Sequence, residues 1–251
     1  MSDRPTPEVL AALLEGRFGR SYTYLERTDS TQDAVRRLAL EGVPEGAVVL
    51  AETQERGRGR QGRSWTGTPG RSLTFSLLLW PRLDPSRLPL LPLAGGLALC
   101  EACGVGGLKW PNDWLLAPDG RKLAGVLLEA HFSGGALGYA VLGVGINVYP
   151  PVPDGAAALA EFGPVRRVEI LARVLGRLEA RYQQLYTDPE GVLSDYRSKS
   201  FTLGRKVSVR TPNGVVEGEA LEVRPDGSLL VKNSAGLHPI TAGDVQIVGV
   251  L

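Results

Sequence analysis

Residues 47–79 read AVVLAETQERGRGRQGRSWTGTPGRSLTFSLLL, two apolar segments of strand length joined by a long polar one. Residues 47–51 are almost continuously apolar, whereas residues 73–79 alternate apolar and hydroxyl side chains in their first half. Both patterns are typical of buried strands. Residues 54–71, between the two segments, contain five arginines and many glycines without a helical or strand period. We therefore expect a loop between two strands.

The first part of that loop, residues 54–65, combines groups that bind anions. Glycines expose successive backbone N–H groups, and the interleaved arginines supply guanidinium groups that match phosphate or carboxylate oxygens. A solvated basic loop or a nucleic-acid-binding Arg-Gly tract would share this composition. However, Gly57, Gly59, Gly62 and the closing Trp65 are more regularly placed than in such a tract, and the rest of the chain is not basic. We interpret the segment as an anion-binding loop.

Composition and charge exclude several protein classes. The chain has 251 residues, of which 43% are hydrophobic and 22% charged, as expected for one large globular domain with at most a small companion. The formal net charge is +1, so we expect no basic field for nucleic acid. The N-terminus lacks the apolar run of a secretion signal, and prolines and glycines interrupt residues 88–100, the most apolar stretch. We therefore predict a cytoplasmic protein without a membrane segment.

Apolar periodicity and capping signals predict further helices and strands outside the loop. We expect helices after Thr6, after Ser30, over 85–102, over 168–185 and after Asp188, and strands over 114–117, 122–132 and 139–148 with a turn at Asp119-Gly120. Ser30 and Asp33 form a Ser-x-x-Asp capping box, so the Ser30 hydroxyl is expected to cap its helix.

The pattern of apolar and turn residues changes at about Phe201. Short apolar segments separated by turn dipeptides, such as Asn213-Gly214 and Asp226-Gly227, predict a small β-barrel similar to SH3-like modules. We therefore predict an α+β fold, with a mixed central β-sheet and flanking helices in a large domain of residues 1–199 and a β-domain in residues 200–251.

Three further stretches place polar side chains where a ligand would meet the backbone. Residues 109–113, KWPND, present a cation, an amide and a carboxylate around a proline, although a loop with a buried tryptophan would look the same. Residues 122–129, KLAGVLLE, open an apolar strand with a lysine, which is also common at strand edges. Residues 143–147, GVGIN, end a strand with glycines that would let a flat ligand approach. Only five of the 28 cationic residues are lysines, which favours a chemical role for the two found here.

In this order, and after Asp29-Ser30-Thr31, these motifs closely resemble those of the biotin protein ligases. The resemblance covers residues 28–148 through the motifs and reaches the C-terminus through the β-domain. Gln32 departs from the family pattern, which often has asparagine after the Ser-Thr pair. Only 28 residues precede Asp29, so the chain resembles the short, monofunctional class without a DNA-binding winged helix. No DNA partner is expected.

The resemblance implies a catalytic fold like that of class II aminoacyl-tRNA synthetases and a reaction in two steps. Biotin and ATP, the substrates, form biotinyl-5′-adenylate and pyrophosphate, with Mg²⁺ expected beside the triphosphate. A lysine of a biotin carboxyl carrier domain of acetyl-CoA carboxylase then attacks the adenylate. A homodimer is a further expectation. Both steps need cations placed between reactants that repel each other.

By motif position, the resemblance also implies a set of site residues. The expected catalytic residues are Lys122, Arg60 and Asp113, with Asp113 either carrying Mg²⁺ or deprotonating the incoming lysine. The expected biotin-binding residues are Ser30, Thr31, Gln32, Gln54, Arg58, Gly59, Arg60, Lys122 and Gly125. The expected nucleotide-binding residues are Arg60, Arg63, Trp65, Lys109, Asn112 and Asn147, with Trp65 as a stacking surface on the adenine side. The ligands of any metal ion are left open.

Alternative functions remain at this point. A lipoate or octanoate ligase-type acyl transferase would share the fold and a lysine such as Lys122, but would not explain the arginine loop together with residues 109–113. A non-catalytic biotin or nucleotide sensor would bind its ligand without forming an adenylate. Cys100 and Cys103 have Cys-x-x-Cys spacing, but only two histidines exist elsewhere, so we expect neither redox nor zinc chemistry there.

Overall fold

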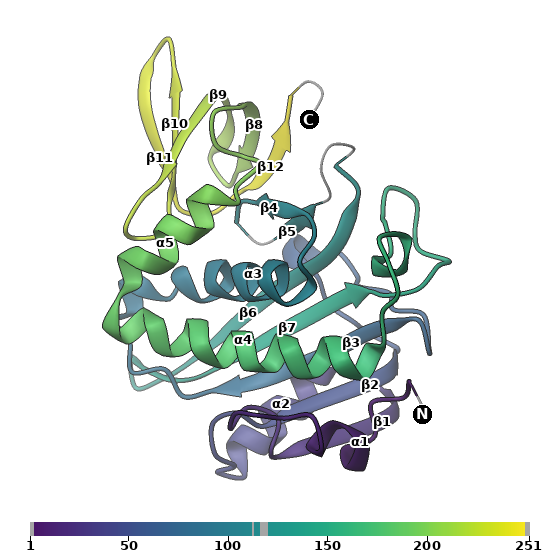
Figure 1. Cartoon of the computed structure of the whole chain (residues 1–251). Coiled ribbons are helices and arrows are strands. Elements are labelled where there is room, and N and C mark those ends of the chain that lie inside the picture. Colours follow the sequence, from purple (N-terminus) through teal and green to yellow (C-terminus); the bar gives the residue numbers. More distant parts are fainter. Residues whose placement is uncertain (1–2, 112, 116–119, 249–251) are drawn as a thin grey trace.

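Within residues 3–111, 113–115 and 120–248, which the computed structural model describes, the strands form two β-sheets (Figure 1). The larger sheet has seven strands in the order β1-β2-β3-β7-β6-β5-β4. The smaller sheet has five strands in the order β11-β10-β9-β8-β12 and lies at one end of the molecule, beyond α5 (Figure 1). The α+β architecture predicted from the sequence is confirmed.

The larger sheet is mixed, as predicted. Its strands are β1 (Tyr22–Thr28), β2 (Val48–Gln54), β3 (Ser72–Leu79), β4 (Gly107–Lys109), β5 (Asp113–Leu115), β6 (Lys122–Ser133) and β7 (Ala136–Asn147). Strands β1 and β2 run parallel, and every other neighbouring pair is antiparallel. Residues 116–119, where the end of a predicted strand and Asp119 of the predicted turn fall, lie outside the described residues.

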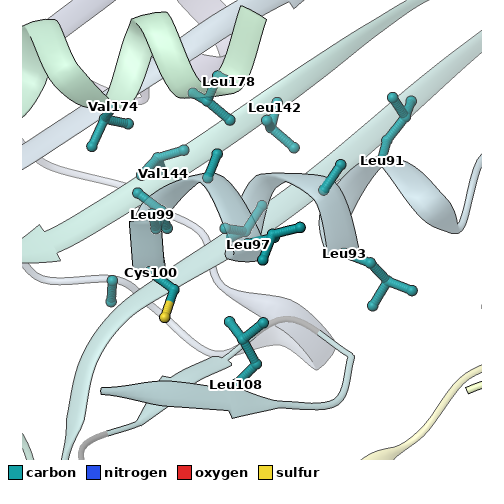
Figure 2. Close-up of a cluster of buried hydrophobic side chains, with 14 of the residues drawn as sticks. Leu91, Leu93, Leu97, Leu99, Cys100, Leu108, Leu142, Val144, Val174 and Leu178 are labelled. Carbon is teal, nitrogen blue, oxygen red and sulfur yellow. The ribbon is translucent and has the colours of Figure 1, made fainter. Parts of the chain in front are cut away.

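Two helices, α3 (Leu90–Cys103) and α4 (Arg167–Thr187), cover one face of this sheet. Helix α3 is apolar on all sides because it is enclosed between α4 and the sheet. In Figure 2 its leucines lie among side chains of α4 above, of β7 beside and of β4 below: Val174, Leu178, Leu142, Val144 and Leu108. The helix expected over 85–102 is divided, since a 3₁₀ turn, η2 (Pro85–Arg87), precedes α3.

The opposite face is covered only in part, by α2 (Thr31–Leu40). Ala34 and Val35 of α2 pack on Val49, Leu78 and Val141 of three neighbouring strands. Where the sheet extends past the N-terminal end of α2, the same face carries small residues instead. The uncovered floor that they leave positions the candidate site.

The capping box predicted at Ser30 is wrong. Ser30 is the N-cap of α2, but its side chain makes no capping hydrogen bond, and its Oγ is buried without a partner among the described residues. The Thr31 N–H in the first turn donates instead to Gln54 Oε1 at 2.7 Å. Asp33, the other member of the predicted box, binds Arg58. Gln54 at the end of β2 and Arg58 of the loop therefore contact this turn, which has no side-chain cap.

The remaining elements connect the two sheets and complete the second one. They are α1 (Pro7–Ala11), η3 (Leu159–Glu161), α5 (Pro189–Ser198), β8 (Lys206–Thr211), β9 (Gly214–Val223), β10 (Leu229–Asn233), β11 (Gly236–Ile240) and β12 (Asp244–Ile247). As predicted, Asp188 caps α5, since its side chain accepts from the Gly191 N–H at 2.9 Å. The indole of Trp110, 1% exposed, donates to the Gly227 carbonyl at 2.9 Å and so joins the smaller sheet to the larger.

Candidate functional site

A half-open pocket lies on the floor that α2 leaves uncovered. Its walls come from the first turn of α2, the end of β2, the arginine loop, and strands β3, β6 and β7. Eight of the nine predicted biotin-binding residues line it, namely Thr31, Gln32, Gln54, Arg58, Gly59, Arg60, Lys122 and Gly125. Ser30 does not line it, although it directly precedes α2. Three predicted nucleotide-binding residues, Arg60, Arg63 and Trp65, also belong to the lining.

Small residues in register create the floor of this pocket. Ser76 of β3 lies opposite Gly143 of β7, and Gly145 of β7 lies opposite Gly125 of β6. Under α2, the same face of β3 and β7 carries Leu78 and Val141 instead. Replacing large side chains by glycine and serine along three adjacent strands therefore leaves room for a ligand.

One wall of the pocket is a chain of hydrogen bonds between polar side chains. Gln54 Oε1 accepts from both the main-chain N–H and the hydroxyl of Thr31, at 2.7 and 2.9 Å. The Thr31 hydroxyl also lies 2.8 Å from the Ser76 hydroxyl. These bonds fix the Gln54 carboxamide, whose role the sequence predicted. Ser76, which the sequence analysis missed, completes the chain.

Three buried polar atoms in the lining have no hydrogen-bond partner within the described part of the chain. They are Nε2 of Gln32, Oγ1 of Thr74 and Nε1 of Trp65. The Gln32 carboxamide packs against Gly143, where an added Cβ would lie 3.1 Å from Gln32 Cδ. A buried polar group without a partner is costly unless a ligand or water satisfies it. These atoms are therefore candidates for contact with a neutral polar ligand group.

The arginine loop folds as a small hairpin over the pocket. Arg58 and Ser64 form an antiparallel bridge, flanked by hydrogen bonds from Trp65 N–H to the Gly57 carbonyl and from Gly59 N–H to the Arg63 carbonyl. The tip is a 3₁₀ turn, η1 (Arg60–Gly62), with Gln61 at φ 53°. The predicted loop is confirmed, but it is ordered by its own main-chain bonds.

Two arginines of the hairpin hold carboxylates at its sides. Arg58 binds Asp33 of α2 and Glu129 of β6, with separations from 2.8 to 3.3 Å. Hydrogen bonds from Arg58 hold the pKa of Asp33 below its usual value, against the opposing effect of burial. Arg63 reaches Asp244 of β12 at 3.1 Å, so the hairpin also contacts the C-terminal sheet.

The closing tryptophan of the loop lies on the glycine floor. A Cβ added to Gly145 would lie 2.1 Å from Cε2 of Trp65, and one added to Gly125 would lie 3.6 Å from its Cζ3. Lys122 Nζ lies 5.8 Å from the centre of the same ring, within range of a cation–π contact. Gly145, one of the glycines expected to admit a flat ligand, thus seats a side chain of the protein itself. The ring is placed as one wall of the pocket.

The main chain of Lys122 is fixed on both sides at the start of β6. Its N–H donates to the Gly155 carbonyl and its carbonyl accepts from Ala157 N–H, both at 3.0 Å. Asn147 Nδ2 donates to the same carbonyl at 3.3 Å. Asn147 is therefore placed beside Lys122 but is not part of the pocket lining.

The predicted residues of the KWPND motif are only partly described. Lys109 lies on β4, opposite Asp113 of β5, and does not belong to the pocket lining. Asp113 pairs through its main chain with Gly125 on the pocket floor. Asn112 lies outside the described residues. Within the described part of the whole chain, no group of three or more His, Cys, Asp or Glu side chains could hold a metal ion.

Sequence reasoning missed the carboxylate partner on β6. Glu129 stood at the end of a quoted motif without a role, and the sheet register brings it to the loop. The alternation along β6, with Gly125, Leu127 and Glu129 on one face, is the signal that would have placed it beside the site.

Comparison with known proteins identifies relatives for nearly the whole chain. Residues 24–147 match the model of the Biotin/lipoate A/B protein ligase family, and residues 202–248 match that of the Biotin protein ligase C terminal domain. A biotin–[acetyl-CoA-carboxylase] ligase of Mycobacterium tuberculosis is 34% identical over 242 residues, covering 90% of this chain and 88% of that protein. One of Paracoccus denitrificans is 30% identical over 245 residues, covering 90% of this chain and all of that protein.

Solved structures agree with the sequence matches. The biotin protein ligase of Aquifex aeolicus in complex with biotin and ATP superposes with a TM-score of 0.76 at 30% identity, covering 91% of this chain and 98% of that one.

Across the described residues, no helix is both long and apolar enough to span a bilayer.

Proposed function

The chain belongs to the Biotin/lipoate A/B protein ligase family, and we propose that its pocket activates biotin with ATP and passes the biotinyl group to a protein lysine. The enzyme is a biotin–protein ligase that uses biotin and ATP as substrates and biotinyl-5′-adenylate as its intermediate. The observation that carries this proposal is the arginine hairpin folded over a pocket with a neutral polar wall at one end and Lys122 within it.

We assign the polar wall to the ureido ring of biotin, which is neutral and offers both N–H donors and a carbonyl acceptor. Gln54 and Thr31 are held in place by their shared hydrogen bonds, and Nε2 of Gln32 is buried without a partner among the described residues. Orienting a neutral group this way leaves the carboxylate of biotin facing the cationic part of the pocket.

In the first step, a biotin carboxylate oxygen attacks the α-phosphorus of ATP, and the bond to the β-phosphate breaks to release pyrophosphate. Lys122 and Arg60 line the pocket where these anions would meet. Their positive charges offset the repulsion between the two reactants and stabilise the charge that develops on the phosphate oxygens. We propose Arg63, Lys109, Asn112 and Asn147 as nucleotide ligands and Trp65 as the wall between the two substrates.

In the second step, the amine of a carrier lysine attacks the carbonyl carbon of the adenylate, and AMP leaves with the electron pair of the broken carbon–oxygen bond. A lysine must lose a proton to act as a nucleophile. We propose that Asp113, whose main chain pairs with Gly125 on the pocket floor, accepts that proton.

We further propose the biotin carrier domain of acetyl-CoA carboxylase as the acceptor, since the relatives in M. tuberculosis and P. denitrificans are named for that substrate. A cytoplasmic location, a homodimer and the absence of a DNA partner complete the proposal. Mg²⁺ is proposed only as the counter-ion of the ATP triphosphate. The described residues contain no metal-binding cluster, so we assign it no ligands.

Transfer of labelled biotin to a purified carrier domain tests this proposal. We expect labelling that requires ATP and the carrier lysine and that lipoate or octanoate in large excess does not suppress. Labelling with lipoate or octanoate in preference to biotin would contradict the substrate assignment. A folded protein that binds biotin but labels no carrier would instead be a sensor.

A further inference from the structure

Arg58 joins three separate elements of the site. Its guanidinium donates to both oxygens of Asp33, at 2.8 and 2.9 Å, and to both oxygens of Glu129, at 3.0 and 3.3 Å. Asp33 lies in the first turn of α2, 25 residues from Arg58, and Glu129 lies on β6, 71 residues from it. Two carboxylates from two different elements, α2 and β6, therefore hold one arginine of the loop.

This arrangement leaves Arg58 little capacity to bind a substrate anion. A guanidinium has five N–H groups, and the contacts with Asp33 and Glu129 account for four hydrogen bonds. With both carboxylates ionised, the three groups carry a net charge of −1, so a carboxylate or phosphate brought to Arg58 would have to displace one of them. The other two loop cations that line the pocket are Arg60 and Arg63, and Arg63 pairs with the carboxylate of Asp244.

The contacts of Arg58 set the position of the whole hairpin. Arg58 is bridged to Ser64, and the next residue, Trp65, donates its N–H to the Gly57 carbonyl at 3.0 Å. Holding Arg58 therefore also holds the strand of the hairpin that seats Trp65 on the glycine floor. The tip, η1, is carried by the same two strands.

We infer that Asp33 and Glu129 are positioning residues, which clamp Arg58 and so keep the hairpin of residues 57–65 closed over the pocket. The inference rests on the proposed function, because the closed hairpin retains the adenylate until the carrier arrives and excludes water from it. The hairpin opens only when the contacts of Arg58 with Asp33 and Glu129 break, so release of the adenylate depends on this one ion-pair cluster.

The side chains of the clamp are only partly exposed, 37% for Arg58, 39% for Asp33 and 29% for Glu129. Solvent screens such contacts, so loss of both carboxylates is expected to shift the opening equilibrium by about fivefold. The informative variant is the double substitution Asp33→Asn with Glu129→Gln, which keeps side-chain shape. Arg58→Ala would instead leave two carboxylates facing each other beside an anion site.

Limited trypsin digestion without substrates tests the clamp independently of catalysis. We expect cleavage after Arg60 and Arg63 to be about fivefold faster in the double variant than in the natural protein, at unchanged melting temperature. Glu55→Gln is the matched control, because Glu55 pairs with Arg27 in an exposed contact outside the pocket. Equal cleavage rates in the double variant and the control would overturn the inference and leave the proposed function untouched.

Release of labelled adenylate provides the second readout. In the absence of carrier, the double variant should lose bound biotinyl-adenylate about fivefold faster, while its kcat for transfer to saturating carrier stays within about twofold. Arg58→Lys keeps the charge but loses the forked contacts, so it should release the adenylate about as fast as the double variant. If Arg58→Lys released the adenylate as slowly as the natural protein, the charge alone would be sufficient. That result would contradict a clamp that depends on the forked contacts of Arg58. A natural protein that forms no adenylate would refute the proposed function, and the digestion result would still stand.

Discussion

The indole ring of Trp65 lies against the main chain of Gly145, so closely that a Cβ at Gly145 would come 2.1 Å from Cε2 of the ring. Trp65 closes the arginine hairpin, and Gly145 lies near the end of β7, 80 residues later in the chain. The glycine is needed there because no other residue leaves room for the ring. The loop and the central sheet are therefore matched to each other at this point.

Substituting Gly145→Ala should displace Trp65 from the floor and open one wall of the pocket. We expect kcat/KM for biotin to fall at least tenfold, because a wall that moves no longer orients the substrate. The melting temperature should change little, since β7 keeps its main-chain bonds. Gly176→Ala, at a helix position where an added Cβ meets nothing within 4 Å, serves as the control. Full activity of Gly145→Ala would show that the seat of Trp65 is unimportant.

Substituting Thr31→Val removes the hydroxyl that bridges Gln54 and Ser76. The Gln54 carboxamide then loses one of its two anchors, and one hydrogen bond of this kind corresponds to about a tenfold change. We expect the KM for biotin to rise by that factor and the KM for ATP to stay nearly constant. Steady-state kinetics with each substrate varied in turn measures the two KM values. Equal changes in the two KM values would contradict the assignment of this wall to biotin. The control is Thr23→Val, on the exposed side of β1.

A buried ion pair between Glu52 and Arg167 joins β2 to the start of α4. Glu52 accepts from Arg167 at 2.8 and 2.9 Å, from Tyr24 at 2.8 Å and from Gly70 N–H at 2.7 Å. Burial raises the pKa of Glu52, but the hydrogen bonds from Arg167, Gly70 and Tyr24 outweigh it and lower the pKa below the usual value. Glu52→Gln should reduce the free energy of unfolding by about 3 kcal/mol near neutral pH, because it leaves Arg167 buried without that charge.

The sign of the pH dependence follows from the lowered pKa. The stabilisation from Glu52 is complete above the pKa of a glutamate in the unfolded chain, about 4.3, and is lost as the pH falls through the lower folded value. The difference in urea midpoint between the natural protein and Glu52→Gln should therefore narrow below about pH 4. A difference that stays constant from pH 7 to the acid limit would contradict a charged Glu52 in the folded state.

Local patterns predicted much of the fold. The alternation in residues 73–79 corresponds to β3, and the apolar stripe over residues 168–185 corresponds to α4. Strand β11 was missed because its five residues include Pro239 and lack a clear alternation. The predicted Ser30 cap does not form: its side chain makes no capping hydrogen bond, and in the same turn the Thr31 N–H donates to Gln54 from the end of β2.

The site was less predictable than the fold, for a physical reason. The motifs named most of the residues that line the pocket, since each carries its chemistry locally. The contacts between motifs depend on strand register, which pairs Gly125 with Gly145 and brings Glu129 to Arg58. Those contacts join residues far apart in the chain, so neither the seat of Trp65 nor the partners of Arg58 could be deduced from local sequence.

The most direct test of adenylate formation is biotin-dependent exchange of labelled pyrophosphate into ATP, measured for the natural protein, for Lys122→Ala and for Lys232→Ala. Lys232 lies on an exposed position of β10 and controls for the loss of a lysine. We predict exchange with biotin in the natural protein and in Lys232→Ala, and a loss of at least a hundredfold in Lys122→Ala, since Lys122 would stabilise charge in the transition state. Exchange that persists in Lys122→Ala, or no exchange from a folded natural protein, would contradict this account.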